Sequence, residues 1–385
     1  MVVFLRLHYT AAYVVFKFPF SVNCLYRLSV AGETSGSTLS VARGRCIRLC
    51  CAVLLAAVTQ VYLSACSPDV PVFTGATMGT SYSVVVPRIK RADQTHLKSD
   101  IDEVLVAINK SMSTYQNDSA ISLFNASKST DWFDVPQSFA QVLQTALVIA
   151  ELSDGAFDPT IGPLVNRWGF GSDQSNSLPS PDEVAMLLEQ TGFEKLKLDS
   201  TASRVKKTSG YLQLDLNSVA KGYAVDQLAA AVEALGYHDY LVEIGGELRA
   251  SGENANGNPW RIGIEHPVSE ATSDNGRKYG IELTTGAVAT SGDYRNAFEH
   301  DGRRYSHIIN ARHGAPVSHA LASVTVVAES AMLADAWATA LMVLGPDEGM
   351  KIAQTHGLAC LFIMRDEQQG FLTTRSAAFR LLDSS

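Results

Sequence analysis

The sequence predicts an α+β fold of mixed or antiparallel sheets with packed helices, in two interlocked lobes with the functional site in the cleft between them. Apolar residues make up 46% of the 385 residues and charged residues 18%, a composition that can bury a sizeable core. Segments with strand-like alternation follow one another without the regular strand–helix alternation of a parallel α/β sheet. Two interlocked lobes are therefore expected rather than two separable domains.

Alternating apolar residues predict strands, which are expected at 81–86, 211–216, 240–244, 260–264, 279–284, 304–309, 322–327, 358–364 and 371–374. Helical periodicity predicts helices, which are expected at 102–112, 136–152, 181–190, 218–235 and 330–344. Ser180 and Pro181 suit the start of the third helix, and Gly345-Pro346 should end the last one. Loops are expected from Gly155 to about Pro181 and at 289–293.

The net charge of −8 argues against a nucleic-acid-binding protein, which needs a basic face. Residues 1–65 nevertheless carry six basic side chains and one acidic side chain. Three arginines up to Arg48 precede the uncharged run 49–65, as in a secretory leader. Leu63-Ser64-Ala65-Cys66 resembles the bacterial lipobox, in which Cys66 is lipidated. We therefore expect a protein that is lipid-anchored to a bacterial membrane and faces the periplasm; an ordinary membrane anchor is the alternative.

The chain is divided accordingly into a leader (1–65), a lipidated cysteine with its tether (66–74), a catalytic domain (75–375) and a tail (376–385). No Met lies between Met1 and Met78, and residues 1–40 are interpreted as a mis-assigned start. Beyond the leader only Cys66 and Cys360 remain, so no disulfide framework is expected, and Cys360 reads as a small buried hydrophobe. No sequence motif of a zinc site occurs.

Asp335 and Thr339 are four residues apart on the last predicted helix, so both oxygens share one face. A carboxylate and a hydroxyl suit a hard cation such as Mg²⁺, which often also binds phosphates. The alternative is an exposed aspartate on the polar face of an amphipathic helix.

Asp215, Ser218 and Lys221 surround a predicted strand-to-helix turn, where free backbone amides favour a phosphate. Lys221 in the first helical turn opposes the helix dipole, and an anionic ligand would offset this cost. The alternative is a solvated lysine. His307 lies on a predicted strand and could act as a general base, although a lone strand histidine is more often structural.

Eight segments in order resemble the ApbE family of FAD:protein FMN transferases, which are often periplasm-facing lipoproteins, over about 75–365. The segments are Thr77–Thr80, Ser113–Tyr115 with Asp118-Ser119, Gly155–Asp158 with Gly162–Asn166 and Trp168–Gly171, Asp215–Tyr223, Gly245-Gly246, Thr290–Gly292, Ser306-His307 and Asp335–Thr339.

The resemblance implies that FAD is held by Met78, Tyr115, Ala156, Phe157, Asp158, Asp215, Lys221 and Ile309. It implies that Mg²⁺ is held by Asp335, Thr339 and the backbone carbonyl of Ser218, and that His307 is the base. The implied reaction transfers FMN from FAD to a threonine of a partner protein as a phosphoester and releases AMP. The implied partners are acceptor subunits of sodium-pumping quinone reductase or Rnf-type complexes.

Three departures from the family pattern concern the metal shell and loop shape: Ala338 stands where some relatives have an acid, Asn310-Ala311 where many have Asp-Pro, and Glu247 where Asn is common. Two other functions stay open. One is an FAD pyrophosphatase that uses water as the acceptor. The other is a lipoprotein that only binds flavin, although binding alone needs no base.

Overall fold

The computed structural model describes residues 70–380 except 172–176, 266, 268–278 and 294–296. The predicted leader, Cys66 and residues 67–69 of the tether lie outside these residues. None of the helices in the described ranges is long and apolar enough to cross a membrane.

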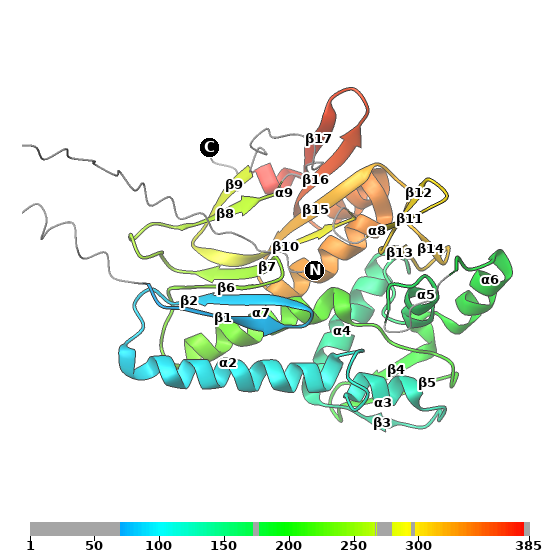
Figure 1. The fold of residues 1–385 in the computed structure, drawn as a ribbon, viewed down its shortest axis with the longest axis horizontal. Coiled ribbons are helices and arrows are strands. Elements are labelled where there is room, and N and C mark those ends of the chain that lie inside the picture. The colour runs from blue at the N-terminus through cyan, green and yellow to red at the C-terminus, as the bar shows by residue number, and fades with distance from the viewer. Residues whose placement is uncertain (1–69, 172–176, 266, 268–278, 294–296, 381–385) are drawn as a thin grey trace, which may run out of the picture. The chain divides into compact units, whose positions relative to one another are not determined.

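An eight-stranded antiparallel sheet forms the centre of the described chain (Figure 1). Its strands, in spatial order, are β1 (Val72–Thr77), β2 (Thr80–Val85), β6 (Tyr240–Ile244), β7 (Glu247–Ser251), β10 (Thr285–Gly292), β15 (Leu321–Ala328), β16 (Ala359–Asp366) and β17 (Gly370–Arg375). Small two- and three-stranded sheets surround it. They pair β3 (Phe133–Asp134) and β4 (Leu196–Asp199) with β5 (Arg204–Lys207), β8 (Trp260–Ile264) with β9 (Tyr279–Leu283), β11 (Ala297–His300) with β12 (Arg303–Ser306), and β13 (Ile309–Asn310) with β14 (Ala315–Pro316). The predicted α+β class is confirmed.

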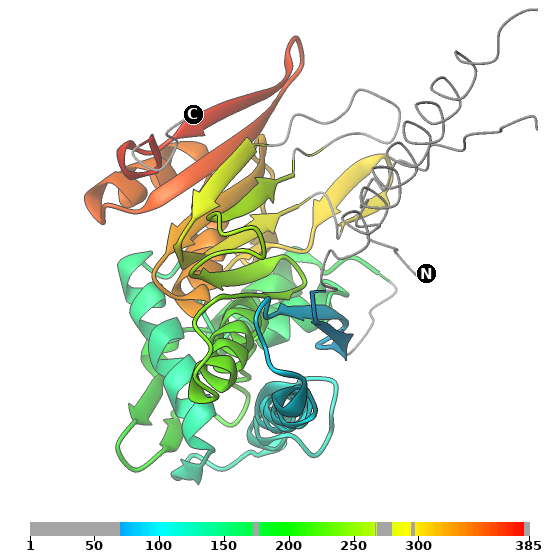
Figure 2. The ribbon, with the colours of Figure 1, turned by 90° about the vertical axis from the view of Figure 1, so that its left-hand side faces the viewer.

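Helices pack on one face of the large sheet, and Figure 2 shows them on one side of its strands. They are α2 (Arg91–Met112), α3 (Ala120–Ala126), α4 (Gln137–Leu152), α7 (Asn217–Ala234) and α8 (Ala331–Thr355). The short α9 (Ala377–Arg380) contributes Phe379 to the cluster on the opposite face. The described chain also forms α5 (Gly162–Arg167), α6 (Pro181–Gln190) and a 3₁₀ turn (Phe193–Lys195). Helices α7 and α8 pack against each other and supply much of the helix-side core.

The sheet separates two hydrophobic clusters, and strand alternation assigns residues to each. On β16, Cys360 and Phe362 belong to the helix-side cluster, whereas Leu361 and Ile363 belong to the cluster on the opposite face. Successive side chains of a strand point to opposite faces, so one strand contributes to both clusters. Cys360 is free and buried, as expected.

The segment 211–216 does not join a sheet as a strand, although Leu212, Leu214 and Leu216 are all buried as the alternation predicts. Its central residue pairs with a side chain instead: Asn125 donates to the Leu214 carbonyl at 2.8 Å and accepts from the Leu214 amide at 2.7 Å. An amide side chain can satisfy both backbone groups that a neighbouring strand would otherwise pair. The alternation therefore identified the buried face but not the pairing.

Gly345 interrupts α8 as predicted, with φ 80° and ψ −175°. The helix nevertheless resumes at Pro346 and continues to Thr355, because proline fits a first helical turn. The predicted last helix was thus too short.

Other boundaries also differ from the prediction. The first helix begins at Arg91 rather than 102, β1 begins inside the predicted tether, and α5 lies inside the predicted 155–181 loop. The predicted loop 289–293 is mostly β10, and the predicted strand 304–309 is divided between β12 and β13.

Candidate active site

A pocket of about 970 Å³ lies where α7, α8 and β10 meet the segments before α5 and after β12. Ten of the predicted site residues line it: Tyr115, Phe157, Asp158, Asp215, Ser218, Lys221, His307, Ile309, Asp335 and Thr339. These residues come from five separate stretches of the sequence, so only the fold brings them together.

Helices α7 and α8 lie so close together that Asp335, which belongs to α8, contacts the N-terminal part of α7. A Cβ at Gly222 would lie 2.2 Å from the carbonyl oxygen of Ala331, so only glycine allows this approach. The Gly222 amide, which in a regular helix donates to the Ser218 carbonyl, donates to Asp335 Oδ2 at 3.0 Å. The predicted metal-binding helix and the predicted phosphate-binding turn are therefore adjacent.

Asp226 and Ser330 fix the start of α8. The carboxylate of Asp226, on α7, accepts the amides of Ala331 and Met332 at 3.0 and 2.9 Å. Ser330 caps the helix through the Leu333 amide. Such contacts satisfy amides that a helix N-terminus leaves without partners, and they hold Asp335 one turn further on.

Lys221 lies between two buried carboxylates. Its Nζ is 2.9 Å from Glu247 Oε1 and 3.7 Å from Asp335 Oδ1. Burial by itself lowers the pKa of Lys221, but the two carboxylates outweigh burial and raise it above its usual value. Burial raises the pKa of Asp335, against the attraction of Lys221. The ammonium therefore stays charged in the pocket.

From the sequence, Glu247 was expected only to affect loop shape, and its place in the pocket was not predicted. The signal available was an acid directly after Gly245-Gly246. Both glycines have positive φ, 63° and 110°, and a Cβ at Gly245 would lie 2.9 Å from Thr80. This tight turn directs the first side chain of β7 into the pocket.

Two aspartates that line the pocket, Asp158 and Asp215, accept hydrogen bonds from backbone amides of neighbouring turns. Asp158 accepts from the amides of Thr160 and Phe193 at 2.7 and 2.9 Å. Burial raises its pKa, although these hydrogen bonds counteract the rise. Asp215 accepts the Asn217 amide at 2.8 Å at the start of α7. Both aspartates therefore stabilise turns beside the pocket, and both also line it.

His307 stands at the end of β12 beside aromatic rings. Its ring centroid is 6.3 Å from that of Phe170, which also lines the pocket. Tyr115 is 68% exposed, so it is a surface ring at the mouth and not a core tyrosine. The wall near His307 can thus accept a flat, apolar group.

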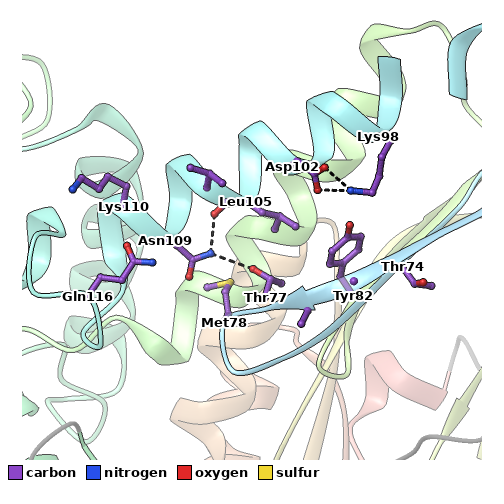
Figure 3. A pocket seen from close by; sticks show the side chains of 13 residues that line it. Thr74, Thr77, Met78, Tyr82, Lys98, Asp102, Leu105, Asn109, Lys110 and Gln116 are labelled. Carbon is purple, nitrogen blue, oxygen red and sulfur yellow. Dashed lines mark hydrogen bonds and ion pairs between the residues drawn. The ribbon is translucent and has the colours of Figure 1, made fainter. Parts of the chain in front are cut away.

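Two predicted FAD-binding residues do not line this pocket. Ala156 is fully buried. Met78 lines a second pocket of about 580 Å³, between the β1–β2 hairpin and α2 (Figure 3). There Asn109 donates to the Thr77 hydroxyl at 3.1 Å and fixes the residue before Met78.

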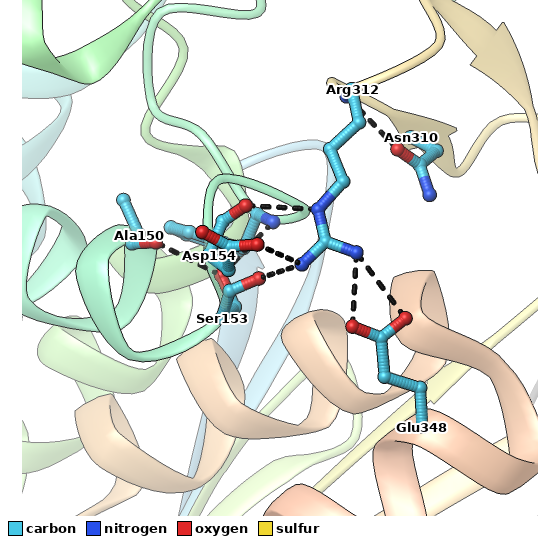
Figure 4. A network of polar contacts seen from close by, with 7 residues as sticks. Ala150, Ser153, Asp154, Asn310, Arg312 and Glu348 are labelled. Atoms are coloured by element: carbon cyan, nitrogen blue, oxygen red, sulfur yellow. Dashed lines mark hydrogen bonds and ion pairs between the residues drawn. The ribbon is translucent and has the colours of Figure 1, made fainter.

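Arg312 connects two segments that border the pocket (Figure 4). It follows the His307–Ile309 stretch, and it donates to the carbonyls of Ser153 and Asp154 at 2.7 and 2.9 Å. Those carbonyls precede the Ala156–Asp158 turn, whose Ala156 carbonyl also accepts the Ala311 amide. The two segments are thereby fixed relative to each other.

Among the described residues, no group of three His, Cys, Asp or Glu side chains is arranged to hold a metal ion. The oxygen donors in the pocket are the Asp335 and Glu247 carboxylates, the Thr339 hydroxyl and the backbone near Ser218. A set of this kind suits Mg²⁺, which uses few protein carboxylates and keeps ligand positions for water and phosphate.

Comparisons with known proteins agree with this geometry. The model of the ApbE family matches residues 78–362. The FAD:protein FMN transferase of Haemophilus influenzae is 37% identical over 339 residues, which cover 86% of this chain and 96% of that protein. The FAD:protein FMN transferase of Vibrio cholerae is 40% identical over 309 residues, with coverages of 80% and 91%.

Solved structures give the same result. The flavin transferase ApbE from Vibrio cholerae matches with a TM-score of 0.75 and 38% identity, over 82% of this chain and 99% of that chain. The apo form of Pseudomonas stutzeri flavinyl transferase ApbE matches with a TM-score of 0.74 and 40% identity, over 82% and 98%. The chain therefore belongs to the ApbE family.

Proposed function

We propose that this protein is an FAD:protein FMN transferase that requires Mg²⁺. It transfers FMN from FAD to a threonine hydroxyl of a partner protein, forms a phosphoester and releases AMP. The observation that carries the proposal is the pocket itself, in which Lys221, His307 and the Asp335–Thr339 pair lie around one cavity. The curated relatives named above bear the name of this activity.

Asp335, Thr339 and the carbonyl of Ser218 would hold Mg²⁺. The buried carboxylate and the hydroxyl one turn later are hard oxygen donors, so the residues present fit the ion. When bound, Mg²⁺ would neutralise charge on the pyrophosphate of FAD.

The side chains of the pocket divide the remaining work. Lys221 stabilises negative charge that grows on the phosphate oxygens, and the first turn of α7 offers backbone amides to the same group. His307 takes the proton of the threonine hydroxyl as that oxygen attacks the phosphorus of the FMN half. The bond between this phosphorus and the bridging oxygen breaks, and AMP leaves with the bridging oxygen. Phe157, Ile309 and Tyr115 offer apolar surface for the flavin or adenine rings.

The test mixes the full chain, FAD, Mg²⁺ and a candidate acceptor, followed by a denaturing gel and AMP quantification. A fluorescent acceptor band with an equal amount of AMP is expected. AMP without the band would identify a pyrophosphatase, and intact FAD would identify a flavin-binding protein; either result overturns the proposal. The acceptors to try first are subunits of sodium-pumping quinone reductase or Rnf-type complexes, with their modified threonine changed to alanine as the control.

We further propose that Cys66 is lipidated and anchors the protein to a bacterial membrane, with the catalytic domain in the periplasm. The support is the basic leader and the sequence 63–66. Labelling with a radioactive fatty acid should mark the wild-type protein and not Cys66→Ser. Equal labelling of both would overturn the assignment.

A further inference from the structure

Glu247 is a buried acid whose second oxygen has no partner. Its side chain is 5% exposed and it lines the active-site pocket. Oε1 lies 2.9 Å from Lys221 Nζ. Oε2 is buried and finds no hydrogen-bond donor among the described residues.

The contact with Lys221 accounts for only one of the two oxygens of the Glu247 carboxylate, Oε1. Buried polar atoms in proteins are almost always hydrogen-bonded, and a buried charge is costly unless it is paired or bound to a metal. Oε1 meets this requirement through Lys221. Oε2 does not, so a ligand of the pocket has to supply its partner, and that partner must be a donor or a cation.

The surroundings of Oε2 favour a cation. Lys221 Nζ lies 2.9 Å from Glu247 Oε1 and 3.7 Å from Asp335 Oδ1, so the two carboxylates share a single ammonium and keep an excess of negative charge. Asp335 is held from its other side by the Gly222 amide, which binds Oδ2. The two carboxylates come from different elements, β7 and α8, and both are almost completely buried.

We infer that Glu247 and Asp335 form the carboxylate pair of the divalent-cation site, in which β7 contributes Glu247 Oε2 as a donor. This inference rests on the proposed function in taking Asp335 as a cation ligand, and it adds a ligand from a different element of the fold. Within this cluster of three side chains, two carboxylates and one ammonium leave one net negative charge, which attracts a divalent cation before FAD binds.

The arrangement gives Glu247 and Lys221 opposite effects on cation binding. Removing the negative charge of Glu247 weakens the site. Removing the positive charge of Lys221 strengthens it in the absence of FAD, because the ammonium repels the cation and competes for the same oxygens. Both effects follow from charge alone, so the position of the bound ion decides whether Glu247 is a ligand or only positions Lys221.

The test is a Mn²⁺ titration of the purified full chain without FAD, followed by electron paramagnetic resonance of the free ion. Glu247→Gln and Asp335→Asn are each expected to raise the Kd for Mn²⁺ about tenfold or more, and Lys221→Met to lower it. Glu282→Gln is the matched control, since it removes the same charge from an exposed position on β9, outside the pocket. Its Kd should stay within about twofold of the wild-type value.

The outcomes separate this inference from the proposed function. If Asp335→Asn weakens Mn²⁺ binding and Glu247→Gln does not, Glu247 only positions Lys221, and the inference is overturned while the function stands. If wild-type protein binds no Mn²⁺ with or without FAD, both are overturned. A crystal of wild-type protein with Mn²⁺ needs no variant: an anomalous peak within about 2.5 Å of both carboxylates supports the inference, and a peak that contacts Asp335 alone overturns it.

Discussion

Glu348 accepts Arg312 Nη1 at 2.9 Å, and this ion pair joins the second half of α8 to the segment that follows His307. Glu348 lies beyond the break at Gly345, so the pair fixes the helix extension that the sequence did not predict. The same guanidinium binds the carbonyls before the Ala156–Asp158 turn (Figure 4). One arginine thus connects three segments around the pocket.

Arg312→Met should lower the free energy of unfolding by about 1–3 kcal/mol, because two backbone carbonyls lose a charged donor. Glu348→Gln should cost less than about 1 kcal/mol, because this carboxylate is half-exposed. Urea unfolding measures both. Equal losses in the two variants would show that the ion pair, and not the carbonyl contacts, carries the stabilisation.

Gly222→Ala should separate α7 from α8. The added methyl would lie 2.2 Å from a backbone carbonyl oxygen, which cannot rotate away. We expect a loss of about 1–3 kcal/mol in unfolding free energy, together with weaker Mn²⁺ binding at Asp335. The control is Gly280→Ala, where a Cβ would meet only the side chain of Arg261 at 3.4 Å. Similar cation affinity in Gly222→Ala and wild type would contradict the stated role of this close approach.

Lys207 should make stability depend on pH in the alkaline range. It is 1% exposed, it donates to the carbonyls of Phe124 and Leu212, and burial lowers its pKa to about 8. Between pH 8 and about 10.5 the unfolded chain holds the proton that the folded chain has lost, so raising the pH favours folding through this group.

Lys207→Met removes this contribution. Relative to the variant, the wild-type free energy of unfolding should rise by up to about 3 kcal/mol across that pH range. Urea unfolding at a series of pH values from 7.5 to 10.5 gives the difference. Parallel pH profiles for the two proteins would contradict the lowered pKa.

Most of the site residues expected from the sequence line one pocket. Asp335 and Thr339 are one helical turn apart, and Asp215 and Lys221 flank one helix start, so local spacing brought out each pair. The resemblance to the ApbE family joined the pairs into one site. Glu247 was missed as a site residue because its role depends on Lys221, which is 26 positions earlier, and on a glycine turn that packs against Thr80. Spacing along the chain cannot show such contacts.

The same limit explains the errors in the fold. Alternation placed Leu212, Leu214 and Leu216 in the core correctly, but it could not show that Asn125 replaces a neighbouring strand. Gly345-Pro346 was interpreted correctly as a break, but a proline that ends one helix also suits the first turn of the next. Both differences depend on tertiary partners rather than on local preference.

His307→Ala should slow FMN transfer by about 100-fold or more, with little change in the Kd for FAD, since a base acts in the reaction and not in binding. Single-turnover transfer and fluorescence titration of FAD separate the two quantities. A proportional loss of binding and transfer would make His307 a binding residue.

The most direct measurement is FMN transfer by Asp335→Ala at saturating FAD over a wide range of Mg²⁺ concentrations, with the covalent product identified by mass spectrometry of the acceptor. The Asp335 carboxylate lies at the start of α7, where it would hold the cation against the pyrophosphate. We predict no flavin-modified acceptor, and no recovery when Mg²⁺ is raised. Transfer at the wild-type rate would contradict the cation site between α7 and α8.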